Sequence, residues 1–164
     1  MTLPEQERER FCQVLHHSRT SLYRLAFSIT RNSSDAQEAG AEAVCRAYER
    51  YPQLREKEKL PRWLLKITAN EARRLCQRRG RTVSLDDLPT EPAIPGRETG
   101  DDTLWQAVQT LPRDQREAVV LFYYEDLPTE EIARIVGTSP GAVRVRLSRA
   151  REKLRSILKE GDYG

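Results

Sequence analysis

PTEEIARIVGTSPGAVRVRLSRAREKLR, residues 128–155, predicts two short helices joined by a tight turn. Thr129 stands where an N-cap is preferred, and the two glutamates that follow it suit the positive end of a helix dipole. Gly137 is expected to end this helix. Ser139 then caps the second helix, and Pro140 occupies its first position, where proline is best tolerated. Two short helices around a glycine turn, the second of them basic, indicate a helix-turn-helix.

The second of these helices carries an unusual excess of positive charge. Residues 139–155 hold five arginines and one lysine against a single glutamate. The buried stripe of this helix is expected to contain Val143, Leu147, Ala150, Leu154, Ile157 and Leu158. Val145, Ser148 and Arg149 face away from the stripe, and cations line both flanks. A solvated surface helix usually mixes both signs, whereas cations on two flanks suit two phosphate ridges, so the pattern predicts that this helix enters the major groove.

The positive charge of the chain is concentrated in two separate segments. Residues 55–79 hold nine basic and three acidic side chains, and residues 143–164 hold seven and three. The segments between them, 80–101 and 102–142, are both acidic, and the whole chain of 164 residues carries a net charge of only +3. Two basic segments separated by acidic ones indicate two contacts with a polyanion such as nucleic acid.

A stretch rich in proline and glycine divides the chain. Residues 80–101 contain three prolines and three glycines without helical periodicity, which predicts a flexible acidic linker that leaves the separation of its neighbours unset. The predicted domains are residues 1–79 and residues 102–164. No alternation of apolar and polar residues is long enough for a strand. We therefore expect an all-α fold of two small helical domains, the second containing the helix-turn-helix.

Helical periodicity predicts further helices on both sides of the linker. In the amino-terminal domain they are expected over residues 22–30, from an N-cap at Ser34 to Pro52, and from Leu60 or Pro61 to Arg79. In the carboxyl-terminal domain an apolar helix is expected within residues 113–126, after one that buries Leu104, Val108 and Leu111.

The basic helix over residues 60–79 has a distinctive outward side. Its inward side is expected to hold Leu60, Leu64, Ile67, Thr68, Ala72 and Leu75. Its outward side carries Trp63, Lys66, Asn70, Arg73, Arg74 and Gln77. Trp63 lies at the margin of the apolar stripe, so it is either a core aromatic or an exposed ring. An exposed ring beside an amide and several cations suits stacking on an unpaired base while the cations hold the nucleic-acid backbone.

Composition disfavours secreted and membrane classes of protein. Cys12, Cys45 and Cys76 are odd in number, far apart and without a C-x-x-C pair, which indicates reduced thiols rather than disulfides or zinc. No apolar run approaches the roughly 18 residues of a membrane span, and the N-terminus lacks the apolar core of a signal peptide. We therefore expect a cytoplasmic protein without membrane insertion.

The quoted residues resemble a bacterial RNA polymerase sigma factor of the extracytoplasmic-function type, over about residues 20–80 and 103–158. The stretch LPRDQREAVVLFYYEDLPTEEIARIVGTSPGAVRVRLSRAREKLR is similar to the family's domain four almost position for position. LYRLAFSITRNSSDAQEAGAEAVCRAYERY and PRWLLKITANEARRLCQRR resemble domain two more loosely. The resemblance implies that residues 1–79 and 102–164 recognise promoter DNA as a subunit of core RNA polymerase. It also implies an anti-sigma factor as a partner.

The resemblance further implies a role for each helical surface. The recognition helix would bind the −35 element as duplex DNA through Ser139, Arg144, Val145, Arg146, Ser148, Arg149 and Arg151. The basic helix would melt the −10 element and capture its single strand through Leu60, Arg62, Trp63, Lys66, Asn70, Arg73, Arg74 and Gln77. The helix after Ser34 would bind the polymerase through Asp35, Glu38, Glu42 and Arg46. DAQEAGAEAV departs from the family's usual D-A-E-D-L-x-Q-E-x-F at Ala39, Ala41 and Val44, which predicts a weaker or differently built polymerase contact.

Two other classes of function compete with this interpretation. The alternative is a stand-alone helix-turn-helix regulator that binds duplex DNA without joining the polymerase. Trp63 and Asn70 discriminate against it, because a protein that binds only duplex has no use for a base-stacking platform. A metal-dependent hydrolase would have to use His16, His17, Glu38 and Glu42, whose spacing matches no ligand or nucleophile motif. We therefore expect no enzymatic activity, no catalytic residue, no metal and no cofactor.

Overall fold

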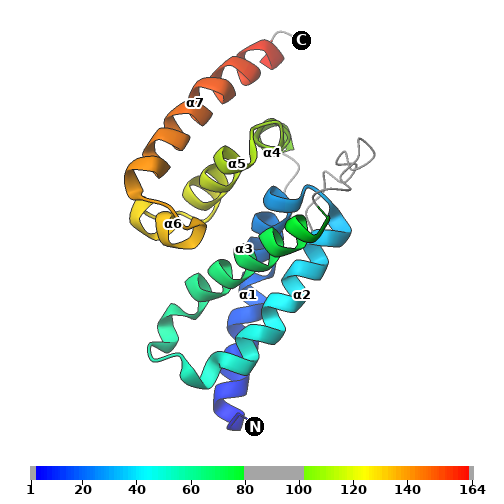
Figure 1. Ribbon diagram of the computed structural model, residues 1–164, viewed down its shortest axis with the longest axis vertical. Helices are drawn as coiled ribbons and strands as arrows, with labels where there is room; N and C mark the ends of the chain where they lie inside the picture. The colour runs from blue at the N-terminus through cyan, green and yellow to red at the C-terminus, as the bar shows by residue number, and fades with distance from the viewer. Residues whose placement is uncertain (1–2, 80–101, 163–164) are drawn as a thin grey trace.

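The computed structural model describes residues 3–79 and 102–162. Within these ranges the regular structure is entirely helical and no strand is present, which confirms the all-α prediction. The helices form an amino-terminal unit, residues 3–79, and a carboxyl-terminal unit, residues 102–162 (Figure 1). The expected linker over residues 80–101 lies outside the described residues.

The amino-terminal unit is a bundle of three long helices. They are α1 (Glu5–Thr30), α2 (Ser33–Arg50) and α3 (Leu60–Arg79), with the short 3-10 turns η1 (Tyr51–Gln53) and η2 (Lys57–Lys59) between α2 and α3. Each long helix packs against the other two. The buried residues of α2 are all alanines: Ala36, Ala39, Ala43 and Ala47. Such small side chains let helices approach closely, so Ala39, one of the departures from the family pattern, belongs to the packing of the bundle.

Helix α1 begins well before the predicted segment of residues 22–30, at Glu5. Its first turns consist of charged and polar residues, which show no apolar stripe and therefore gave no periodic signal. The buried ring of Phe11 ties this part of α1 to the bundle. It packs edge-on against Tyr48 and Tyr51, with ring centroids 5.4 and 5.3 Å apart.

The carboxyl-terminal unit consists of shorter helices and one long final helix. They are α4 (Asp102–Gln109), α5 (Arg113–Val119), the π-helix η6 (Val120–Tyr124), α6 (Thr129–Val136) and α7 (Pro140–Asp162). Val108 and Leu111 are buried as predicted, but Leu104 is 37% exposed, and Trp105 of α4 is fully buried in its stead. The Trp105 ring lies against the rings of Phe27 and Tyr124. Contacts with residues distant in the sequence therefore decide that α4 buries its tryptophan rather than Leu104.

Two predicted N-caps are wrong. Asn32 rather than Ser34 caps α2, because Oδ1 of Asn32 accepts a hydrogen bond from the backbone N–H of Asp35 at 2.9 Å. Thr129 is the first residue of α6, and Pro128 holds the cap position. Serine, threonine and asparagine share the chemistry of a cap, so neighbouring candidates are separated only by the backbone conformation that tertiary packing selects.

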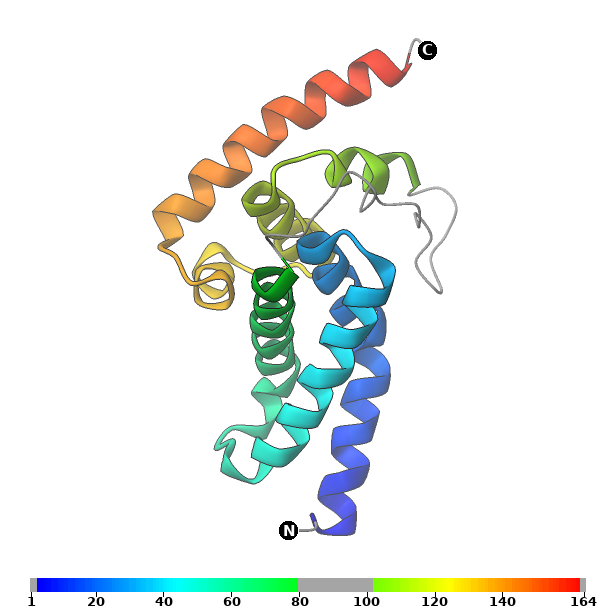
Figure 2. The same ribbon diagram turned by 45° about the vertical axis from the view of Figure 1, so that its right-hand side comes forward.

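The two units pack against each other (Figure 2). Helix α1 contacts α5 and η6, and α3 contacts α6. Arg116 of α5 is buried and donates hydrogen bonds to the backbone oxygens of Ser28 at 2.6 Å and Leu111 at 2.7 Å. Burial lowers the pKa of Arg116 to about 10, so its guanidinium is still charged at neutral pH. Arg24 of α1 pairs with Glu125 at 2.8 Å. These contacts define how the two units are placed relative to each other, which the sequence did not predict.

Candidate nucleic-acid interface

Helices α6 and α7 form the predicted helix-turn-helix. Gly137 adopts φ 78°, a left-handed conformation that favours glycine, and its backbone N–H binds the oxygen of Ala133 at 2.8 Å. Ser139 caps α7 as predicted, because its Oγ accepts a hydrogen bond from the backbone N–H of Ala142 at 3.1 Å. These local bonds fix the angle at which α7 leaves the turn.

One face of α7 is buried and the opposite face is open. Val143, Leu147 and Ala150 are buried against the rest of the carboxyl-terminal unit, as the periodicity predicts. On the other side Ser148 and Arg149 are exposed, and Val145 is a large apolar side chain left 48% exposed. A protruding helix with small side chains along its exposed centre can approach the edges of base pairs closely.

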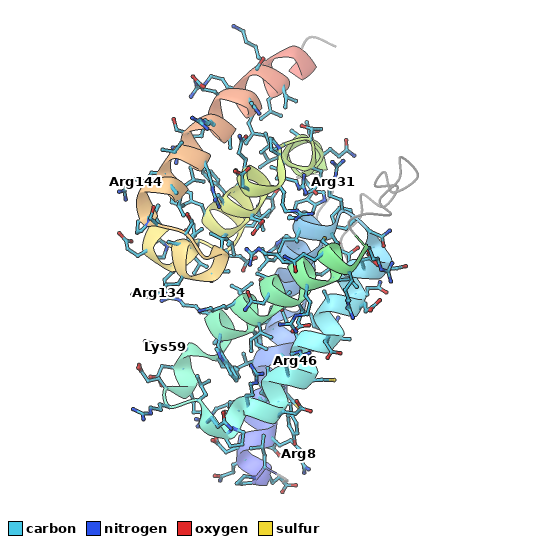
Figure 3. The ribbon with its side chains drawn as sticks, in the orientation of Figure 1. Arg8, Arg31, Arg46, Lys59, Arg134 and Arg144 are labelled. Carbon is cyan, nitrogen blue, oxygen red and sulfur yellow. The ribbon has the colours of Figure 1, made fainter. Side chains whose placement is uncertain are left out.

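The cations of α7 fall into two groups. Arg144 and Arg149 are exposed and, within the described part of the chain, take part in no ion pair. Arg144 points away from the body of the protein at the outer edge of α7 (Figure 3). Arg146 lies 3.7 Å from Asp114 of α5, and Arg151 is held by η6. Two of the predicted DNA contacts are therefore open, and two are anchored within the unit.

Tyr123 of η6 is a neighbour of the recognition helix that the sequence interpretation missed. Its Oη accepts a hydrogen bond from Nε of Arg151 at 2.6 Å, and the guanidinium of Arg151 lies over the rings of Phe122 and Tyr123. Tyr123 is half exposed although it follows a buried apolar run. An exposed aromatic residue next to a basic helix is a signal that could have identified it.

The outward side of α3 has the composition that the sequence predicts. Lys66, Asn70 and Gln77 are exposed, while the six residues expected on the inward side are all buried. Trp63 is half-buried and packs against the core with part of its ring still accessible, so both interpretations of this residue hold in part. Leu60 is fully buried, which corrects its prediction as a contact of single-stranded DNA: it is a core residue.

Other cations of α3 are engaged by the carboxyl-terminal unit. Arg62 forms an ion pair with Glu131 of α6 at 3.2 Å, and Arg73 pairs with the buried Glu117 of α5. In both cases a glutamate of the carboxyl-terminal unit pairs with an arginine of the amino-terminal unit. Pairs between residues so distant along the chain leave no local signal in the sequence.

The residues predicted to bind polymerase come together with cations of α3. Asp35 and Glu38 both lie near Arg79, at 2.7 and 3.5 Å, and Arg46 lies 3.5 Å from Glu42. A small hollow of about 160 Å³ opens between α2 and α3 at this point. Its lining consists of Glu38, Ala39, Glu42, Arg46, Glu71, Arg74, Leu75 and Arg78. The surface is therefore a network of alternating charges rather than an acidic patch.

Both halves of the chain match models of one protein family. Residues 14–82 match sigma-70 region 2, and residues 101–154 match sigma-70 region 4. RNA polymerase sigma factor SigV of Bacillus subtilis (strain 168) is 32% identical over 142 residues, which cover 85% of this chain and 86% of SigV. The ECF RNA polymerase sigma factor SigE of Mycolicibacterium smegmatis is 31% identical over 148 residues, which cover 84% of this chain. The chain belongs to the extracytoplasmic-function sigma factors.

The similarity of this sigma factor to its relatives extends over both units. A solved structure, that of the sigma factor RpoE in complex with the anti-sigma factor NepR from Bartonella quintana, matches with a TM-score of 0.77 at 25% identity. The match covers 95% of this chain and 98% of the other. The relatives differ in length: the match covers only 57% of the Mycolicibacterium protein.

Membership of the family decides between the competing functions. A sigma factor directs core RNA polymerase to promoters, and the match to region 2 has no place in a stand-alone regulator of duplex DNA. Within residues 3–79 and 102–162, no helix of this sigma factor is both long and apolar enough to cross a membrane.

Proposed function

We propose that this sigma factor recognises a promoter with two separate surfaces, one in each unit. The exposed face of α7 binds the −35 element as duplex DNA through Ser139, Arg144, Val145, Arg146, Ser148, Arg149 and Arg151. The outward face of α3 captures the single strand of the −10 element through Arg62, Trp63, Lys66, Asn70, Arg73, Arg74 and Gln77. The observation that carries this proposal is the contrast between the buried stripe of α7 and its open cationic face.

The geometry of α7 supports binding in the major groove. Arg149 is exposed near the centre of the open face, where a guanidinium can make paired hydrogen bonds to guanine. Val145 and Ser148 leave room for close approach. Arg146 and Arg151 sit on opposite flanks and are already oriented by Asp114 and Tyr123, which suits contacts with the phosphate backbone.

The geometry of α3 supports capture of an unpaired base. Trp63 rests part of its ring on the core, which holds the aromatic plane in place, and keeps the remainder accessible. Asn70, which lies on the same outward side, can donate to and accept from a base edge. Stacking on a fixed ring combined with backbone contacts from cations is how single strands are commonly held.

The remaining assignments concern the partners of the chain. Asp35, Glu38, Glu42 and Arg46 on α2 form the contact with core RNA polymerase, and residues 1–79 and 102–164 act as its two functional domains. Bond formation belongs to the polymerase, so the sigma factor itself catalyses no reaction and needs no metal or cofactor. It works in the cytoplasm. An anti-sigma factor is a further partner, supported by the complex in which its structural relative RpoE was solved.

Site-specific crosslinking in the reconstituted holoenzyme tests this division. A photoreactive amino acid is placed at Val145 or at Asn70, both exposed, and the holoenzyme is bound to promoter DNA. We expect Val145 to label duplex at the −35 element and Asn70 to label the non-template strand at the −10 element. Gln13, exposed on α1, is the matched control and should label no DNA. Labelling of one and the same DNA region from both positions would contradict the proposal.

A further inference from the structure

Glu71 is a buried carboxylate of α3, next to the exposed Asn70. Its side chain is only 6% exposed. Nε of Arg46, from α2, lies 2.7 Å from Oε2 of Glu71, and Nη1 of Arg74 donates a hydrogen bond to the same oxygen at 2.9 Å. A carboxylate withdrawn from water is stable only when cations or hydrogen bonds compensate for its lost hydration, and here two guanidinium groups do so.

The two arginines belong to different proposed surfaces. Arg46 lies on α2, beside Glu42, in the region assigned to polymerase binding. Arg74 lies on α3, in the region assigned to the −10 strand. The side chains of Arg46 and Arg74 are 34% and 51% exposed, so each guanidinium meets solvent on one side and Glu71 on the other. A guanidinium has five N–H donors, so its contact with Glu71, an ion pair for Arg46 and a hydrogen bond for Arg74, leaves donors for an external partner.

The hollow between α2 and α3 places this arrangement at the surface. Glu71, Arg46 and Arg74 all line it. An external group that enters the hollow would therefore meet two guanidinium groups that share Glu71 as an ion-pair partner, at 2.7 Å for Arg46 and 2.9 Å for Arg74. A long side chain that is already held in one orientation loses less conformational entropy when it binds a partner. Each arginine can therefore bind its partner more tightly without making any additional contact.

We propose that Glu71 is a positioning residue shared by the polymerase-binding surface and the strand-capturing surface. It orients Arg46 toward the polymerase and Arg74 toward the backbone of the −10 strand. The inference rests on the proposed function of those two arginines. It gives Glu71 a role beyond joining α2 to α3, and it makes both binding events depend on one negative charge.

Neutralisation of this charge in the full-length chain tests the role. Glu71→Gln keeps the size of the side chain and removes its charge. We expect affinity for core RNA polymerase, measured by fluorescence anisotropy, to fall about tenfold, a typical size for coupling within one ion-pair network. Capture of the −10 strand by the holoenzyme on a pre-melted template should also fall, by about fivefold. Both measurements are made at a temperature where circular dichroism shows the variant folded.

Double-mutant cycles separate positioning from general stability. In an Arg46→Ala background, Glu71→Gln should change polymerase affinity by less than about twofold, and in an Arg74→Ala background it should leave strand capture similarly unchanged. Glu117→Gln is the matched control for polymerase affinity, because Glu117 is as deeply buried and also pairs with an arginine, Arg73, but lies in α5. It should bind polymerase as the wild type does.

The outcomes distinguish this inference from the function on which it rests. If Arg46→Ala weakens polymerase binding and Glu71→Gln does not, Glu71 has no positioning role and the inference is overturned. Additive losses in the double mutants overturn it as well. If Arg46→Ala itself has no effect, the assignment of α2 to polymerase binding fails. If Glu71→Gln does not fold, Glu71→Asp replaces it in the same double-mutant cycles. Aspartate keeps the negative charge but holds it farther from the two arginines, because its side chain is shorter. We then expect losses of polymerase affinity and strand capture that are smaller than those predicted for Glu71→Gln and are again non-additive.

Discussion

The outward faces of α7 and α3 carry similar charges but present them differently. On α7, Arg144 and Arg149 are exposed and form no ion pair within the described part of the chain. On α3, Arg62, Arg73 and Arg74 each pair with a carboxylate of the same protein. The comparison teaches that a basic pattern in the sequence marks where a polyanion can bind, while the tertiary structure decides whether the site is open.

The difference follows from the acidic character of the carboxyl-terminal unit. Residues 102–142 carry seven acidic and three basic side chains, and their helices pack next to the basic α3 (Figure 2). Glu117 and Glu131 therefore lie against arginines that are proposed to hold a DNA strand. Under the proposed function, these carboxylates stand where the phosphates of the strand would bind, and we expect the two pairs to separate before Arg62 and Arg73 hold the strand.

The largest expected effect comes from breaking the contact between the units. Arg24→Ala leaves the mostly buried carboxylate of Glu125 without its cation. Removal of one partner of such a pair lowers the stability of the packed structure by about 3 kcal/mol. We expect small-angle X-ray scattering to show a larger radius of gyration. The free chain should also bind a single-stranded −10 oligonucleotide more tightly, because Arg62 and Arg73 lose their pairing with Glu131 and Glu117.

The exposed pair of Arg8 and Glu5 provides the control for this experiment. Arg8→Ala should leave both the radius of gyration and oligonucleotide binding unchanged, because exposed ion pairs contribute little. An Arg24→Ala variant with unaltered dimensions and unaltered affinity would show that the carboxyl-terminal unit does not mask α3.

The open face of α7 is tested by its central arginine. Arg149→Ala in the holoenzyme should weaken binding of the −35 duplex by about 1–3 kcal/mol, because it removes a contact to a base edge. Arg155→Ala, on a flank farther along α7, should act mainly on the salt dependence, because it removes a phosphate contact. Titration at several salt concentrations measures both. Equal losses that do not depend on DNA sequence would refute the assignment of Arg149.

The half-buried ring on α3 is tested by strand opening. Trp63→Ala should cost about 1–3 kcal/mol in promoter melting, because a stacking surface for one base is lost, and should leave closed complexes on duplex nearly unchanged. Permanganate reactivity of promoter thymines measures opening, and a pre-melted template should restore much of the lost transcription. Trp63→Phe, which keeps a ring, serves as the control. Loss of the folded state by circular dichroism in Trp63→Ala would instead make Trp63 a core residue.

The smallest effects concern the helix caps. Ser139→Ala and Asn32→Ala should each reduce the free energy of unfolding by about 1 kcal/mol, because each removes a side-chain acceptor from a helix N-terminus. Ser34→Ala should be close to neutral, since Ser34 is exposed and does not cap α2. Chemical denaturation of the three variants makes the comparison. A larger effect at Ser34 than at Asn32 would argue against the cap described here.

Several features of this sigma factor were determined by the sequence alone. The turn at Gly137, the cap at Ser139 and the buried stripe of α7 follow from neighbouring residues, because capping and helical periodicity are local properties. The inward face of α3 was predictable for the same reason. The early start of α1 was not, because its first turns depend on one anchoring ring, Phe11, rather than on a repeating pattern.

Only the tertiary structure decided which of the predicted surface residues are available. Arg73 meets Glu117 across 44 positions of the chain. Trp105 is buried where Leu104 was predicted to be, and it packs against the distant ring of Phe27. Glu71, one acidic residue among many in the sequence, becomes a buried anchor only when α2 brings Arg46 to it. Ion pairs and burial are set by which elements meet in space, and charge patterns along a single helix carry no information about the partner that covers them.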